Sequence, residues 1–140
     1  MATTNATLTL TSADISSDAL NVSRAATLYK ADTTTGLEQT TGLQKTIFSA
    51  VTNIVLFDST ALGVNKAAKV YIANKSIDPA EFVTITINAQ IVGRLYAGDW
   101  MFIPWSQSDA AGNIELQPSV ATALPVEYMM VHEGITQTSA

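Results

Sequence analysis

The chain has 140 residues, 47% of them hydrophobic and 14% charged, so it can build one packed core and carries too little charge for general disorder. Twelve acidic and seven basic residues give a formal net charge of −5, and the basic residues never form a run, so nucleic acid is not an expected partner. The chain has no cysteine, which excludes disulfides, thiolate catalysis and Cys-based zinc sites.

The first seven residues, Met-Ala-Thr-Thr-Asn-Ala-Thr, lack a basic region and a continuous apolar stretch. We therefore expect no signal peptide and no transmembrane helix, and no membrane among the partners. The chain is expected to be made in a cytoplasm.

Threonine is abundant throughout, and its branched Cβ favours strands over helices. In the N-terminal region, residues 8–11 and 19–30 are predicted strands. Residues 34–45 hold an imperfect repeat, TTGLEQ followed by TTGLQK. Leu37 and Leu43 lie six residues apart in it, and an even spacing places them on the same side of an extended chain. Two readings stay open: a surface loop, or a segment whose leucines dock on a neighbouring subunit.

The middle of the chain predicts further strands at residues 43–50, 53–57, 69–74 and 81–88. Residues 53–57 contain an uninterrupted apolar run, which is typical of a central strand covered on both faces. Residues 81–88 alternate apolar and polar side chains and indicate a strand with one buried face. Turn residues separate 69–74 from 81–88, so these two strands are expected to pair antiparallel.

In the last third, residues 90–96 and 100–105 read as two strands joined by a tight Gly-Asp turn, with Pro104 ending the second. A polar loop is predicted over 106–113, followed by a short strand at 114–116, a break at Pro118 and a last strand at 126–132.

Turn signals recurring about every 8–12 residues, without helical periodicity, predict an all-β fold. We expect a single-domain β-sandwich, jelly-roll or Greek-key-like. Residues 1–45 form an extended Thr-rich region that packs on or extends from the core, residues 46–134 form the sandwich core, and residues 135–140 form a flexible tail.

The sequence offers little chemistry. His132 is the only histidine, and a lone histidine near a strand end is more often a satisfied structural residue than a base. Asp14 with Asp18, and Asp109 with Asn113 and Glu115, lack the spacing of a calcium loop. We expect no catalytic residues, no metal site and no cofactor, and hence not an enzyme, although a pair of acids for glycoside hydrolysis could still meet in the fold.

The segment from Trp100 to Trp105 is the most conspicuous apolar run. Alternation places Trp100 and Phe102 on one face of a strand, and Met101, Ile103 and Trp105 on the other. One face can close the core, and the other must meet a loop, a second sheet or a partner chain. Trp100, Phe102 and Trp105, with Leu37 and Leu43, are therefore the candidate protein-interface residues.

Four short strings carry a resemblance: TGLEQTTGL at 35–43, VYIAN at 70–74, IVGRLYAGD at 91–99 and VEY at 126–128. On these strings the chain resembles small virion structural proteins of tailed bacteriophages, especially those of marine cyanophages. The resemblance implies a β-rich capsid decoration (cement) protein or an accessory head or tail component, and no catalytic residues.

We therefore expect a non-enzymatic virion protein that binds the outer surface of a phage head and stabilises the shell. Its partners would be the major capsid protein or other virion proteins, and a homo-oligomer is also compatible with the sequence. A tail, neck or fibre component is the structural alternative. A carbohydrate-binding module or small β-barrel hydrolase is the alternative of another class.

Overall fold

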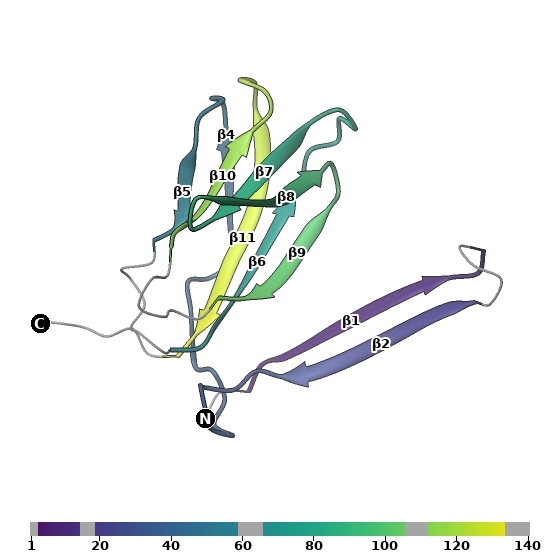
Figure 1. The fold of residues 1–140 in the computed structure, drawn as a ribbon, viewed down its shortest axis with the longest axis vertical. Helices are drawn as coiled ribbons and strands as arrows, with labels where there is room; N and C mark the ends of the chain where they lie inside the picture. The colour runs from purple at the N-terminus through teal and green to yellow at the C-terminus, as the bar shows by residue number, and fades with distance from the viewer. Residues whose placement is uncertain (1–2, 15–18, 59–65, 106–111, 134–140) are drawn as a thin grey trace, which may run out of the picture.

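The computed structural model describes residues 3–14, 19–58, 66–105 and 112–133. These residues form eleven strands and no helix, which confirms the all-β prediction (Figure 1). The first sheet contains, in order, β5 (Ile54–Phe57), β10 (Ile114–Pro118), β7 (Phe82–Ile87) and β8 (Gln90–Tyr96). The second contains β3 (Gln39–Thr40), β11 (Leu124–His132), β6 (Ala68–Asn74) and β9 (Trp100–Pro104), with β4 (Gln44–Phe48) also paired to β11. A separate hairpin joins β1 (Asn5–Ser12) and β2 (Leu20–Thr27).

The two larger sheets have the wiring of a jelly roll. From β4 to β11 the strands pair first with last: β4 with β11, β5 with β10, β6 with β9 and β7 with β8, all antiparallel. Such a ribbon of four strand pairs, rolled into two facing sheets, is the eight-stranded jelly roll. The second sheet holds β4, β11, β6 and β9, and the first holds the other four. The predicted sandwich is therefore confirmed.

Period-two alternation builds the core between these sheets. Val70 and Ile72 of β6 are fully buried, as are Val83 of β7 and Leu116 of β10, because each points from its sheet into the space between the layers. The main cluster is completed by residues from both sheets and the loops beside them: Phe48, Phe57, Ala68, Ile85, Leu95, Trp105, Ile114, Leu124, Val126 and Met130.

The pairing of neighbouring strands differs from the sequence prediction. The expected β6–β7 pair is wrong, because the turn between them carries the chain from one sheet to the other. The turn at Gly98 likewise joins β8 to β9 across the sheets instead of closing a hairpin, although the strands and Pro104 as a strand end are confirmed. The tight hairpin in this region joins β7 to β8 through Asn88 and Ala89, whose positive φ values (53° and 62°) suit a type I′ turn.

The apolar strand at residues 54–57 is also placed differently. It was predicted to be central, but β5 is an edge strand that pairs only with β10. Phe57 turns into the core and Val55 is exposed. The uninterrupted apolar run therefore does not mark a strand covered on both faces.

A bulge divides the edge strand beside β11 into β3 and β4. Thr40 lies opposite Val131 and Gln44 lies opposite Tyr128, so the three residues 41–43 of the edge strand face only the two residues 129 and 130 of β11. The extra residue is accommodated at Gly42, whose φ of +81° is costly for other residues.

Candidate functional site

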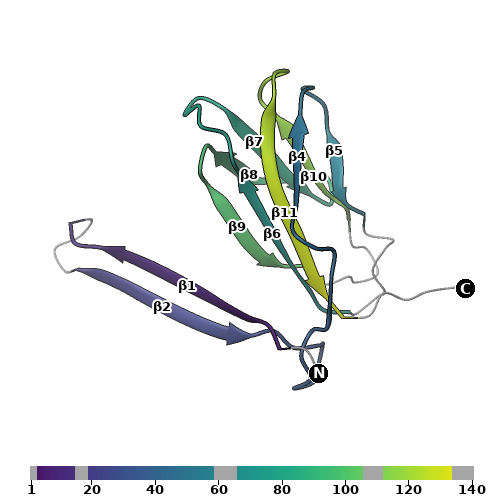
Figure 2. The same cartoon turned by 180° about the vertical axis from the view of Figure 1, so that it is seen from behind.

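The β1–β2 hairpin projects from one end of the sandwich, and we call it the arm (residues 5–12 and 20–27; Figures 1 and 2). Only the base of the arm, Ala6 and the adjoining Leu28, packs on the sandwich, and we call this part the root. Leu28 and Leu37 form a second apolar cluster with Ala67 and Val131, and Ala6 and Phe102 pack against it. Two backbone hydrogen bonds also join the segments at the root: the Leu28 N–H donates to the Thr4 carbonyl (2.9 Å), and the Leu37 N–H donates to the Leu28 carbonyl (3.0 Å).

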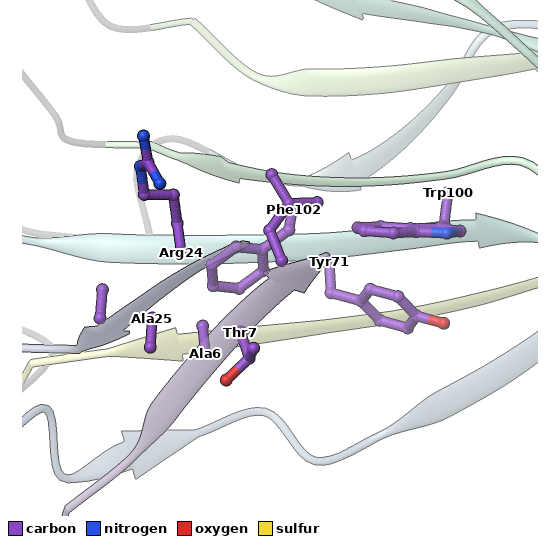
Figure 3. Close-up of a pocket in the computed structure, with 9 residues that line it drawn as sticks. Ala6, Thr7, Arg24, Ala25, Tyr71, Trp100 and Phe102 are labelled. Carbon is purple, nitrogen blue, oxygen red and sulfur yellow. The ribbon is translucent and has the colours of Figure 1, made fainter. Parts of the chain in front are cut away.

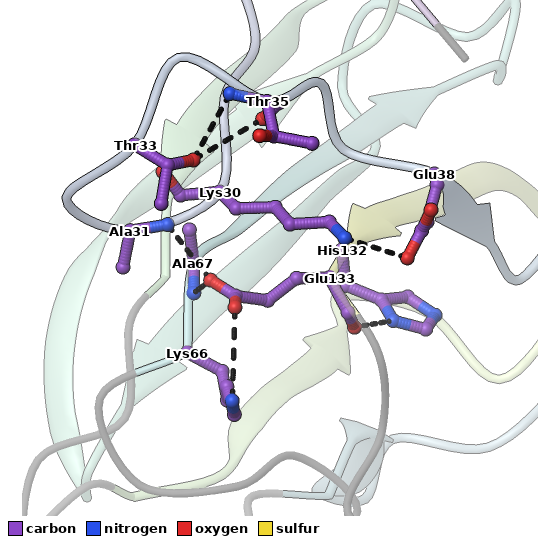
Figure 4. Close-up of polar contacts among 9 residues, drawn as sticks. All are labelled: Lys30, Ala31, Thr33, Thr35, Glu38, Lys66, Ala67, His132 and Glu133. Atoms are coloured by element: carbon purple, nitrogen blue, oxygen red, sulfur yellow. Dashed lines mark hydrogen bonds and ion pairs between the residues drawn. The ribbon is translucent and has the colours of Figure 1, made fainter. Parts of the chain in front are cut away.

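A buried carboxylate completes this attachment (Figure 4). Oε2 of Glu133 accepts hydrogen bonds from the backbone N–H groups of Ala31, at 2.9 Å, and Ala67, at 2.6 Å. The Lys66 ammonium lies 3.8 Å from its Oε1. Burial alone would raise the pKa of Glu133, but the two backbone hydrogen bonds and the charges of Lys66 and Lys30 lower it below its ordinary value. The ionised carboxylate thus holds the loop after the arm to the start of β6.

The two faces of the arm differ in chemistry. The register pairs Leu10 with Val22 on one face, and Thr9 with Ser23 on the other. The first face is apolar apart from Ser12 and Arg24: Ala6, Leu8, Leu10, Ser12, Leu20, Val22, Arg24 and Ala26. The second is almost entirely polar: Asn5, Thr7, Thr9, Thr11, Asn21, Ser23, Ala25 and Thr27. We call these the apolar and polar faces of the arm.

A cleft of about 570 Å³ separates the arm from the outer face of the second sheet (Figure 3). Its lining is Ala6, Thr7, Leu8, Arg24, Ala25 and Ala26 from the arm, and Tyr71, Trp100 and Phe102 from β6 and β9. Register places the three aromatic residues on one outer face, with Tyr71 opposite Phe102 and Ala73 opposite Trp100. Both walls of the cleft are thus largely apolar.

A hydrogen bond fixes Tyr71, one of the residues that line the cleft on the side of the second sheet. The hydroxyl of Tyr71 donates to Oε1 of Glu127 on β11 at 2.9 Å. Burial, followed by this hydrogen bond and the negative charge of Glu127, raises the pKa of Tyr71 above its ordinary value of 10.0. The ring therefore stays a neutral donor at neutral pH.

The structure places the predicted interface residues in three different environments. Trp105 belongs to the core, where its ring lies 6.1 Å from that of Phe57 and its indole N–H donates to the Gly112 carbonyl at 3.3 Å. Phe102 is half-buried between the sheet and the arm root. Trp100 is 53% exposed and lines the cleft.

The two leucines of the repeat do not share an exposed face, contrary to the prediction. Leu37 is 1% exposed, because it packs inside the second cluster of the same chain, whereas Leu43 is 62% exposed beside the bulge. The bulge at Gly42, between the two leucines, breaks the even spacing that an extended segment would have. Leu43 alone of the pair is available to a neighbour.

The candidate chemical residues occupy structural positions. His132 is buried, and its Nδ1 lies 2.6 Å from the backbone carbonyl of Glu133. Asp14 accepts a hydrogen bond from the Ser12 hydroxyl. Asp18 and Asp109 lie outside the described residues, as do residues 106–111 of the predicted polar loop and the predicted tail at 135–140. Within the described ranges, no three His, Cys, Asp or Glu side chains gather as a metal site.

Sequence reasoning missed Arg24, Leu8 and Leu10 as cleft and arm residues. The signal was present in the run Thr7-Leu8-Thr9-Leu10-Thr11, whose alternation gives a strand with one apolar face. The pairing of this strand with residues 20–27, which unites two apolar stripes, was not visible locally.

Comparison of the chain with protein-family models, with curated proteins and with solved structures gave no match. In the part of the chain that the structure describes, no helix is long and apolar enough to cross a membrane.

Proposed function

We propose that this chain is a non-enzymatic virion structural protein that decorates the outer surface of a phage head and stabilises the shell. The observation that carries the proposal is the jelly-roll sandwich with Leu43 and Ile47 exposed along the outer edge of its second sheet. Jelly rolls recur in viral shells, and also in lectins. Because a fold hosts many functions, the exposed surfaces must carry the argument.

The shell contact we favour is the outer edge of the second sheet. Leu43 and Ile47 are both more than half exposed, and they flank Lys45 on β4. Exposed apolar side chains with polar residues at their rim are typical of a protein–protein contact. On a symmetric shell many weak contacts act together, so each copy needs only a limited area.

The proposal is tested on particles purified from the source of the chain. The protein is expected in them at a fixed ratio to the major shell protein by mass spectrometry, and labelled antibody should mark heads in electron micrographs. Particles assembled without the protein should lose their genome at a lower temperature. Absence of the chain from purified particles refutes the virion role, and labelling of tails would favour the tail, neck or fibre alternative.

Retention can be assigned to the edge with a matched pair of variants. Leu43→Ser with Ile47→Ser should lower retention on particles about tenfold or more without changing the melting temperature, because both side chains are exposed. Val55→Ser, an exposed apolar residue on the other sheet, is the control and should be retained normally.

A carbohydrate-binding module is the second candidate, favoured by the exposed ring of Trp100 next to Tyr71 on a sheet face. Sugar rings stack on such aromatic side chains, and lectins share the jelly-roll architecture. Binding of a glycan that is lost in Trp100→Ala would support this candidate. No feature of the described residues specifically favours the alternative of a small hydrolase.

A further inference from the structure

We propose that the arm docks on a second copy of this chain, with the outer half of its apolar face covering the outer face of the partner's second sheet. The inference concerns the purified protein and does not depend on the virion role. It uses the arm and the aromatic face around Trp100, not the Leu43 edge.

The first reason is that the outer half of the arm lacks a cover in its own chain. Leu8 and Leu10 are 43% and 52% exposed, although they belong to a face with Leu20 and Val22 across the strand pair. A two-stranded hairpin is marginally stable in water unless a further layer covers its apolar face. The root has that layer in the second cluster, whereas the rest of the arm leaves the sheet at an angle (Figure 2).

The second reason is that the same molecule carries an uncovered surface of matching kind. Trp100, which is 53% exposed, and the partly exposed Tyr71 lie on one outer sheet face, and a smaller hollow continues from them to Lys75 and Gly98. In β proteins the apolar faces of two sheet layers pack about 10 Å apart. The apolar face of the arm and the aromatic face of the second sheet can pack on each other in this way. Because the arm leaves its own sheet at an angle (Figure 2), a neighbouring copy can offer its sheet to the open half.

The third reason is area. The outer half of the hairpin, four residue pairs of its two eight-residue strands, covers a footprint of about 14 by 10 Å at the usual strand dimensions. A two-fold arrangement makes the contact twice, since each copy gives one arm and receives one. The two footprints then add to roughly 280 Å² per copy. Side-chain surfaces are rough, so the accessible area is larger, but it stays below the ~800 Å² per partner of standard interfaces, and we therefore expect a weak dimer. A single one-way contact would bury only half of this area, which favours the two-fold exchange.

The test uses sedimentation velocity and light scattering of the purified full-length chain from about 1 to 300 µM. Wild type should be a dimer in the micromolar range. Leu10→Asn with Val22→Asn, a facing pair on the apolar face, should weaken self-association at least 30-fold. The control is Thr9→Asn with Ser23→Asn, the neighbouring pair on the polar face, which should dimerise like wild type. Circular dichroism and melting curves exclude misfolding, since both pairs lie away from the packed root.

A second readout locates the contact on the sheet. In a Trp105→Phe background Trp100 is the remaining tryptophan, and its quenching by acrylamide should fall several-fold as the protein dimerises. Trp100→Asn should also weaken the dimer. A chain that stays monomeric at 300 µM, a dimer that survives the Leu10 and Val22 changes, or a dimer that leaves Trp100 fully quenchable overturns the proposal. A monomer that still binds particles through the Leu43 edge would separate this failure from that of the virion role.

Discussion

Removal of the Glu133 carboxylate should release the root of the arm. In Glu133→Ala the N–H groups of Ala31 and Ala67 lose their shared acceptor. A hydrogen bond to a charged group is worth about 1.5–3 kcal/mol, so losing both should cost about 3 kcal/mol or more. Both bonds reach the same oxygen, so the amide oxygen of Glu133→Gln can replace it as a neutral acceptor. That variant should cost only about 1 kcal/mol, because its hydrogen bonds lack charge assistance.

The neighbouring lysine provides the control. Lys66 is 3.8 Å from the carboxylate and its side chain is 42% exposed, so Lys66→Gln should cost no more than about 0.5 kcal/mol. The assay is urea unfolding at pH 7, with hydrogen exchange at the Ala31 amide as a local measure of root opening. If Lys66→Gln costs as much as Glu133→Ala, or if the Ala31 amide exchanges no faster in Glu133→Ala, the Glu133 carboxylate does not hold the root of the arm.

The same group predicts a pH dependence. The folded-state pKa of Glu133 lies below the ordinary value of 4.5. The stabilisation by the ionised group is therefore complete above the unfolded pKa and is lost as the pH falls through the folded pKa. The stability difference between wild type and Glu133→Gln should be constant from pH 7 to about 5 and should shrink below about pH 4. A difference that persists at pH 2 would contradict this assignment.

Three further substitutions test other parts of the fold. Tyr71→Phe should lower stability by about 1 kcal/mol at pH 7 through loss of the hydrogen bond to Glu127. Since the pKa of Tyr71 is raised, the higher stability of the wild type should hold below pH 10 and fade above the folded-state pKa. Urea unfolding at several pH values measures both effects. Leu37→Ala should cost about 2–5 kcal/mol and Leu43→Ala less than about 0.5 kcal/mol in thermal unfolding, and equal costs would show that burial does not separate them. His132→Ala should lower stability by about 1–3 kcal/mol in the same assay through loss of packing and of its bond to the Glu133 carbonyl, whereas His132→Gln should leave incorporation into particles unchanged.

The strands were predictable where local pattern decides them. Residues 81–88 alternate because one side of β7 faces the opposite sheet. Pro104 and Pro118 end their strands as predicted, since proline has no N–H to donate to a ladder. The last strand, β11, also lies where its alternation indicated, although it begins two residues earlier.

Strand partners could not be read from the same pattern. A turn of good local chemistry allows a hairpin, but it equally allows the chain to cross to the facing sheet, as it does between β6 and β7 and between β8 and β9. The choice depends on the pairing of β6 with β11, whose residues are more than fifty positions apart. The burial of Leu37 depends likewise on Val131, at the far end of the chain.

The root of the arm and the proposed dimer contact are coupled, which gives a last prediction. The second cluster and the two hydrogen bonds to Glu133 hold the root of the arm, and we expect them to set the direction in which the arm leaves the sandwich. The direction of the arm sets the distance between its apolar face and the second sheet of its own chain. It therefore also sets how well each arm can reach the second sheet of the other copy. A loosened root must be ordered again on association, which costs conformational entropy. Glu133→Ala should therefore weaken dimerisation about tenfold, although Glu133 lies outside the proposed contact, while Glu133→Gln should change it less than threefold. Sedimentation velocity of folded Glu133→Ala at pH 7 measures this; an unchanged dimerisation constant would show that the arm direction does not depend on the hydrogen bonds to Glu133.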